Sequence, residues 1–361
     1  MQPYSRQYSA RLFLSLSILS VLFISSCSDV VVPGDECINC GPLPGHIVVS
    51  DMVFVDSLAG WIITYRDSTG SSSIFKTVNG GVSWFKQGDA SPTRGPSISF
   101  LDGIHGWVTL DSGRVTHTSD GGFTWNIQDL GDSHMWTTSI LFTDPEHGWA
   151  SAYGLLSGTK IFHTSNGGTN WTQVYHGYVG ALPSLAVIGK HLWAAGGAML
   201  DNFDSPVVVY SHDGGLTFNL GDFQNYSGPL NGVYFTAEAL GIAGGMGGVF
   251  TSSDSGMNWN PSFSWGVLDM AGTFGPVVWI TGTGRSYLST SIYKTTNSGQ
   301  EWTEEWTSPT DPLIIVTRLS FPSPTSGFAS GAEYDSARNF VRPVIMKYSG
   351  AGWAILGADT L

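Results

Sequence analysis

Short stretches of alternating apolar and polar residues recur along the chain from residue 46 onward. Stretches 97–100 and 317–321 place an apolar side chain at every second position. This period of two is that of a β-strand with one buried face. A Gly-Trp pair or a related pair follows each stretch, at 60–61, 106–107, 148–149, 192–193 and, in weaker form, 241–242, 278–279 and 327–328. Seven such units predict seven groups of short strands.

A second repeat, an octapeptide, falls between these pairs. It reads Ser or Thr, any residue, Asp or Asn, any residue, Gly, any residue, Ser, Thr or Asn, and then Trp or Phe. The copies are 77–84, 118–125, 164–171, 211–218, 252–259 and 295–302, the last with Glu at the seventh position, and 347–353 is a degenerate seventh copy. Successive aromatic ends lie 41 to 51 residues apart. A nearly constant period of this length is typical of a repeat protein.

The two repeats together divide each unit into four strands. The unit around residue 100 is the clearest, with strands expected at 97–101, 106–110, 114–118 and 124–129. Four short strands per repeat are typical of β-propeller blades. We therefore predict an all-β, seven-bladed propeller over residues 46–361, with four antiparallel strands per blade. The seventh blade can supply all four of its own strands.

Composition narrows the function. The formal net charge is −13, and only 15 residues are Lys or Arg. Binding to nucleic acid or to an anionic bilayer surface needs a cationic face, so neither is expected. The hydrophobic content of 42% is ample for a buried core, which excludes a disordered chain.

The octapeptides resemble Asp boxes, also called BNR repeats, which occur in sialidases, sortilin-type receptors, xyloglucanases and photosystem II stability/assembly factors. The combination of Gly-Trp pairs with boxes is most similar to the assembly-factor family. That resemblance implies a seven-bladed propeller with a scaffolding role, although the photosynthetic role itself need not carry over.

The polar residue at the third octapeptide position is expected to be structural. Its side chain can accept backbone N–H bonds in an Asx-type turn, and the following Gly supplies a positive φ. Three copies carry Asn, which cannot act as an acid or a base. These structural positions are Asn79, Asp120, Asn166, Asp213, Asp254 and Asn297.

A glycoside hydrolase is the alternative to a binding protein. The Phe-Arg-Ile-Pro motif of sialidases is absent, and sialidase propellers have six blades. Another glycosidase would need two carboxylates about 5–9.5 Å apart, for which Asp201, Asp204 and Asp311 are loose candidates. We assign no catalytic residue, no metal site and no cofactor.

Ligand contact is expected on the propeller face that carries the irregular loops, because the other face consists of regular turns. Aromatic residues there suggest a surface for a protein or a sugar. An equally open interpretation is that the rings pack between blades and that the arginines are ordinary surface charges. The candidate binding residues are Trp136, Tyr226, Trp265, Trp306, Arg94 and Arg285.

The N-terminal residues 1–27 have the features of a signal peptide. Arg6 and Arg11 precede an apolar run at 12–24, which is too short to span a bilayer. The run ends in Ile-Ser-Ser-Cys, which resembles the lipobox of bacterial lipoproteins and implies lipidation at Cys27. An ordinary cleaved signal with an incidental Cys is the alternative.

Residues 28–45 form the predicted tether, which contains Cys37 and Cys40. In an oxidising compartment these two thiols are expected to form a disulfide, and metal binding or redox chemistry is the alternative. The sequence thus predicts a monomeric, lipid-anchored lipoprotein of the bacterial cell envelope, attached to either the periplasmic or the surface face of the outer membrane. It would act as a binding or assembly scaffold for a protein or glycan partner.

Overall fold

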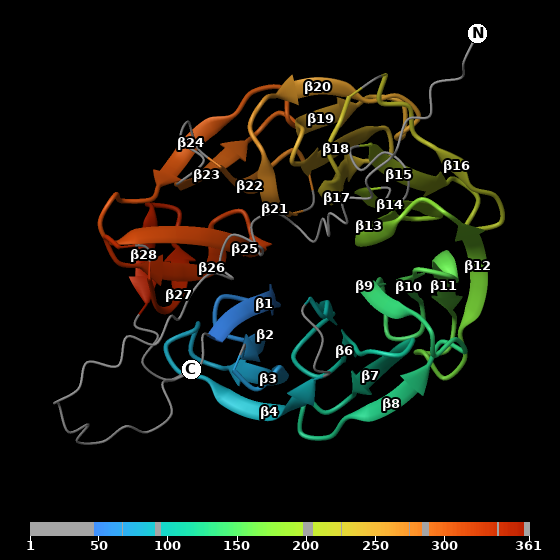
Figure 1. Ribbon diagram of the computed structural model, residues 1–361, viewed down its shortest axis with the longest axis horizontal. Helices are drawn as coiled ribbons and strands as arrows, with labels where there is room; N and C mark the ends of the chain where they lie inside the picture. Colours follow the sequence, from blue (N-terminus) through green and yellow to red (C-terminus); the bar gives the residue numbers. More distant parts are fainter. Residues whose placement is uncertain are drawn as a thin grey trace, which may run out of the picture. The chain divides into compact units, whose positions relative to one another are not determined.

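The fold is described from a computed structural model for residues 47–66, 68–90, 95–197, 205–224, 226–273, 275–283, 289–337 and 339–356. Every regular element in these residues is a β-strand, and the 28 strands form seven four-stranded sheets. Figure 1 shows the sheets arranged as blades around a central axis, with β1, β9, β13, β21 and β25 nearest to it. The prediction of a seven-bladed, all-β propeller is confirmed.

Each blade consists of four strands that follow one another in the chain. Blade 1 is β1 (Ile47–Phe54), β2 (Gly60–Arg66), β3 (Ser71–Thr77) and β4 (Phe85–Ala90). Blade 2 is β5 (Ile98–Phe100), β6 (Gly106–Thr109), β7 (Arg114–Thr118) and β8 (Asn126–Asp129). Blade 3 is β9 (Trp136–Phe142), β10 (Gly148–Gly154), β11 (Gly158–Thr164) and β12 (Thr172–Gly177). Blade 4 is β13 (Ala181–Ile188), β14 (His191–Gly197), β15 (Pro206–Ser211) and β16 (Asn219–Leu220).

The remaining blades follow the same scheme. Blade 5 is β17 (Leu230–Ala237), β18 (Leu240–Gly245), β19 (Gly248–Ser252) and β20 (Asn260–Phe263). Blade 6 is β21 (Val267–Gly272), β22 (Val278–Thr283), β23 (Thr290–Thr295) and β24 (Thr303–Thr307). Blade 7 is β25 (Leu313–Ser323), β26 (Ser326–Tyr334), β27 (Phe340–Tyr348) and β28 (Trp353–Leu356). The fourth strand of blade 2 begins two residues later than predicted, because Thr124 and Trp125 belong to the octapeptide turn.

Burial follows the place of a strand in its blade. The second strand lies between two neighbours and between two blades, so β10 is buried along its whole length. The fourth strand lies at the rim, and β4 and β12 are largely exposed or half-buried. Polar residues therefore concentrate in the fourth strands, whereas the second strands are rich in Gly, Ala, Trp and Ile.

Aromatic stacking joins neighbouring blades. The ring at the start of a second strand stacks on a Phe at the end of the first strand of the next blade, with centroids 3.5–3.7 Å apart. The pairs are Trp61–Phe100, Trp107–Phe142, Trp193–Phe235, Trp279–Phe321 and Phe328–Phe54. A Gly before such a ring makes room for the Phe of its own blade, which in turn stacks on the ring of the preceding blade: a Cβ on Gly148 would lie 2.5 Å from the Phe142 ring, which stacks on Trp107. The Gly-Trp repeat is thus a packing unit that spans two blades.

The ring closes between blades 7 and 1 without exchange of strands, because β25 to β28 pair only among themselves within the named sheets. Side chains hold this seam. The amide of Phe54 donates to the Ser320 hydroxyl at 2.8 Å, and Arg318 Nε donates to the carbonyl of Ser50 at 2.6 Å. Phe54 and Phe328 stack beside these bonds.

Candidate functional site

The octapeptides form closed turns whose polar atoms bond one another. In blade 2, Asp120 Oδ1 accepts the Thr124 amide at 2.9 Å and the Thr118 hydroxyl at 2.8 Å. Asp120 Oδ2 accepts the Thr124 hydroxyl at 2.6 Å. These bonds, above all those from Thr124, lower the pKa of Asp120 to about 2. The carboxylate is thus held ionised by its own turn.

The same pattern recurs in the other copies. The third-position oxygen accepts the amide four residues ahead at 2.9–3.0 Å in Asn79, Asn166, Asp213, Asp254 and Asn297. Hydrogen bonds from Thr217 lower the pKa of Asp213 as well. An Asn amide oxygen serves this geometry as well as a carboxylate does, which explains why both residue types occur.

The strand order gives the propeller two distinct faces. The octapeptide face carries the turns between first and second strands and the octapeptide turns between third and fourth strands. The loop face carries the loops between second and third strands and the connections between blades. The candidate binding residues Trp136, Tyr226, Trp265 and Trp306 belong to the loop-face ends or connections of their blades.

Four of these six candidates lie in the part of the chain that the structure describes. Trp136 begins β9 with half of its surface exposed, and Tyr226 is 40% exposed in the connection between blades 4 and 5. Trp265 is half-buried against Phe263 and Tyr293, with ring centroids 5.1 and 5.3 Å away. Trp306, also half-buried, packs on a core cluster of blades 6 and 7. Trp136 and Tyr226 can therefore meet a partner, whereas Trp265 and Trp306 contribute mainly to packing.

The other site predictions fall outside the described residues. They are Arg94, Arg285 and the three cysteines Cys27, Cys37 and Cys40.

Further apolar side chains are exposed around Trp136 on the loop face of blade 3. The turn after β10 exposes Leu155 and Leu156, the latter by 96%, and Tyr178 after β12 is 66% exposed. Tyr178 lies beside Gly158 of the same turn, because a Cβ on that Gly would lie 3.1 Å from its ring. We call Trp136, Leu155, Leu156 and Tyr178 the blade 3 patch. The sequence analysis missed the leucines, although two apolar residues in a tight turn are a usable signal.

A charged cluster lines the inner strands at the seam. Arg318 on β25 interacts electrostatically with Asp51 on β1 and Asp269 on β21. Burial raises the pKa of Asp269 to about 7 despite the opposing effect of Arg318, and burial also raises the pKa of Asp51. Each carboxylate accepts a backbone amide of the next blade, Leu319 at 2.7 Å for Asp269 and Ile98 at 2.9 Å for Asp51.

The three residues of this cluster occupy equivalent positions in their blades. Each position lies beside a β-bulge of the first strand. In blade 4 the equivalent Ser184 hydroxyl accepts the Val233 amide at 3.1 Å. The position thus serves to link adjacent inner strands, and the charged versions gather around the seam. The sequence analysis did not single out Asp51, Asp269 or Arg318, because each lies alone within an otherwise ordinary strand pattern.

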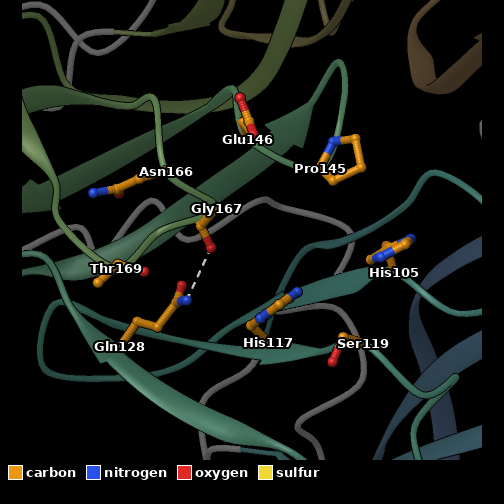
Figure 2. Close-up of a pocket in the computed structure, with 9 residues that line it drawn as sticks. All are labelled: His105, His117, Ser119, Gln128, Pro145, Glu146, Asn166, Gly167 and Thr169. Carbon is orange, nitrogen blue, oxygen red and sulfur yellow. Dashed lines mark hydrogen bonds between the residues drawn. The ribbon is translucent and has the colours of Figure 1, made fainter.

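A depression of about 420 Å³ lies on the octapeptide face between blades 2 and 3 (Figure 2). Its lining is polar and comes from both blades: His105, His117, Ser119, Gln128, Pro145, Glu146, Asn166, Gly167 and Thr169. Within the described ranges, no three His, Cys, Asp or Glu side chains are grouped so that they could hold a metal ion. The same residues contain no helix of the length and hydropathy needed to cross a membrane.

No protein-family model matches the chain. In sequence it is similar to the photosystem II assembly lipoprotein Ycf48 of Synechococcus sp. (strain CC9902), with 27% identity over 193 residues, 51% of this chain and 52% of that protein. It is also similar to the chloroplastic photosystem II stability/assembly factor HCF136 of Oryza sativa subsp. japonica, with 30% identity over 138 residues, 36% of this chain and 31% of that protein. The matched segments thus span about half and about a third of these relatives.

Solved structures agree on the fold. A structure of YCF48 bound to a D1 peptide superposes with a TM-score of 0.60 at 18% identity, over 85% of this chain and 93% of that chain. YCF48 from Cyanidioschyzon merolae superposes with a TM-score of 0.58 at 18% identity, over 86% of this chain and 98% of that chain. The GH74 xyloglucanase from Xanthomonas campestris superposes with a TM-score of 0.54 at 14% identity, over 73% of this chain and 45% of that chain. The predicted resemblance to photosystem II assembly factors is thus found in sequence, and the structures share the propeller fold.

Proposed function

We propose that this protein is a non-catalytic scaffold that binds a segment of a partner protein on its loop face. The observation that carries the proposal is the blade 3 patch, in which Leu156 is 96% exposed beside Leu155, Trp136 and Tyr178. Exposed aromatic and aliphatic side chains that gather at one place are typical of protein-binding surfaces. Tyr226 and Met246, both exposed, extend the apolar character of this face to blade 5.

A protein is favoured over a glycan because the patch combines rings with aliphatic side chains. Sugar-binding surfaces need polar groups next to flat rings, whereas leucines anchor peptides in hydrophobic contacts. The similarity to Ycf48, one solved form of which holds a D1 peptide, supports the same choice. The Asp-box character of the turns and the predicted lipid anchor at Cys27 are consistent with a scaffold at the cell envelope.

The proposal is tested by site-specific photocrosslinking in cells that naturally carry this protein. A photoreactive residue replaces Leu156 on the loop face or, as matched control, Leu216, which is 83% exposed on the octapeptide face. We expect one protein to crosslink from position 156 and not from position 216. Purified with that protein, the Leu156→Ser variant should bind at least ten-fold more weakly, while Leu216→Ser binds normally. Equal crosslinking from both faces, or normal binding by Leu156→Ser, would refute the loop-face assignment.

A further inference from the structure

The last residue before the octapeptide occupies a repeated place over the aromatic ring of the second strand. In blades 1 and 6 it is a lysine, and the equivalent position of blade 7 is Lys347, the first residue of the degenerate copy, which pairs with Phe328 as Lys76 pairs with Trp61. Lys76 Nζ lies 4.7 Å from the Trp61 ring centroid, Lys294 Nζ lies 5.3 Å from Trp279, and Lys347 Nζ lies 5.3 Å from Phe328. In blades 2 and 3 it is a histidine, and the rings of His117 and Trp107 stack 4.6 Å apart. In blade 3 the His163 ring lies 4.2 Å from that of Trp149. A cation or an imidazole therefore lies against the ring of the second strand in five blades.

Two of the lysines also bind the next blade. Lys76 Nζ donates to the carbonyl of Gly121 in blade 2 at 3.1 Å, and Lys347 Nζ donates to the carbonyl of Ser57 in blade 1 at 3.1 Å. Each ammonium group lies beside the fourth residue of the neighbouring octapeptide. A Cβ on Gly80 would lie 2.7 Å from Lys347 Nζ, and one on Gly121 would lie 2.8 Å from Lys76 Nζ. The ammonium group is thus part of these two blade interfaces.

The interface between blades 2 and 3 has the same backbone but no ammonium group at this place. Gly167 donates to the Glu146 carbonyl at 2.8 Å, as Gly121 donates to that of Ile104 at 2.9 Å. A Cβ on Gly167 would lie 3.0 Å from the Pro145 carbonyl oxygen, just as a Cβ on Gly121 would lie close to the Gly103 carbonyl oxygen. Unlike the Cβ on Gly121, however, the Cβ on Gly167 would have no lysine within 4 Å. Figure 2 shows that the depression opens here, between His117 on one side and Gly167 and Pro145 on the other.

The residue at position 117 explains why the space is open. A histidine is shorter than a lysine, so His117 covers the Trp107 ring without reaching the next blade. Its Nε2 atom is buried and has no hydrogen-bond partner among the described residues. Burial and the nearby His105 lower its pKa, so the ring is neutral at pH 7 and does not supply the missing charge.

The groups around the space favour a cation. Glu146 lines the depression and adds a negative charge, and the Pro145 carbonyl corresponds to the Ser57 carbonyl that accepts Lys347. The Gly167 carbonyl is already occupied by the Trp107 indole at 3.2 Å and by Gln128 Nε2 at 2.9 Å. The Pro145 carbonyl and the Glu146 carboxylate are among the acceptors that remain for an incoming donor. The net charge of −13 attracts cationic partners over longer distances.

We propose that the depression between blades 2 and 3 receives the ammonium group of a lysine side chain from a partner protein. The ligand takes the place that Lys76 and Lys347 fill within the chain itself. This site lies on the octapeptide face and is independent of the blade 3 patch.

The test uses the full chain and a small probe, Nα-acetyl-lysine amide, followed by ¹⁵N-TROSY NMR. We expect saturable shifts at the amides of Gly167 and Glu146 with a dissociation constant of roughly millimolar, as suits one side chain. Nα-acetyl-norleucine amide has no charge and should bind at least five-fold more weakly. Tighter binding of the arginine analogue, or shifts scattered over the acidic surface, would contradict an ammonium site.

Two reciprocal variants make the test specific. His117→Lys should fill the depression from within, abolish the shifts at Gly167 and raise Tm by about 1–2 °C. Lys76→His should open a second site, with new probe shifts at Gly121. Undiminished probe binding by His117→Lys would overturn the proposal. If Lys76→His fails to fold, the measurement on His117→Lys is sufficient by itself to test the proposal. Leu156→Ser should leave probe binding unchanged, so that failure of this site and failure of the loop-face function are distinguishable.

Discussion

Phe54 of the first blade stacks on Phe328 of the last blade, with ring centroids 3.5 Å apart and planes 6° apart. The two residues are distant in sequence, and their contact helps to close the ring at a point where no described strands pair between the two blades. It repeats the Trp–Phe stacking between other blades, with Phe in place of Trp. The seam is therefore built like the four other blade interfaces that have this ring stack.

Replacing the buried Phe328 by Ala should destabilise the protein by about 3–5 kcal/mol, because the cavity opens at the seam and removes the partner of Phe54. The free energy of unfolding in urea measures this. Phe123→Ala, at a position 80% exposed, is the control and should change it by less than about 0.5 kcal/mol. A similar loss of unfolding free energy in both variants would mean that the Phe54–Phe328 stack contributes no more to stability than an exposed Phe does.

Gly148→Ala should disturb the stack between blades 2 and 3. The added methyl would lie 2.5 Å from the Phe142 ring and push it away from Trp107, at an expected cost of about 1–3 kcal/mol. Near-UV circular dichroism should change together with Tm. Gly103→Ala is the matched control, because nothing lies within 4 Å of its Cβ position. An unchanged aromatic spectrum in Gly148→Ala would contradict the packing role assigned to this Gly.

Thr118→Val should weaken the octapeptide turn of blade 2. The Thr118 hydroxyl accepts the Gly122 amide at 2.8 Å and donates to Asp120 at 2.8 Å, and both bonds would be lost from a buried position. We expect a loss of about 2 kcal/mol in unfolding free energy. Thr118→Ser keeps the hydroxyl, as in the copies that begin with Ser211 and Ser252, and should cost about 1 kcal/mol or less. If both variants lost the same stability, the methyl group and not the hydroxyl would be the important part.

Asp269 should make stability depend on pH near neutrality. Its pKa is raised from 3.8 when unfolded to about 7 when folded, so the folded state favours the protonated acid. The resulting stabilisation is complete below pH 4 and is lost as the pH rises to about 7. Asp269→Asn imitates the protonated form and should flatten the fall in stability between pH 5 and 8. Urea unfolding across this range would contradict the assignment if the two proteins kept parallel profiles.

The sequence was sufficient for the architecture because every blade repeats two local signals. The Gly before Trp107 or Trp149 and the third-position Asp or Asn each have one local steric or hydrogen-bonding task, so the pattern predicts the turn and the strand beside it. The site was harder to predict. Whether Trp136 is exposed and Trp265 half-buried depends on contacts between blades, and the role of Arg318 requires two carboxylates from separate strands. Such long-range neighbours leave no trace in the local pattern.

The four consecutive strands of each blade have a consequence for how the ring could change over time. Apart from an isolated bridge between Asp222 and Asn258, no strand pairing of the described residues crosses from one blade to another. A whole blade could therefore be duplicated, lost or exchanged by recombination at its connecting loops without breaking a hydrogen-bonded ladder. The incoming blade would need only a ring that stacks on the Phe of the next blade and a Gly that leaves space for its own Phe. Modularity of this kind lets one blade acquire a new surface while the other six keep the scaffold intact.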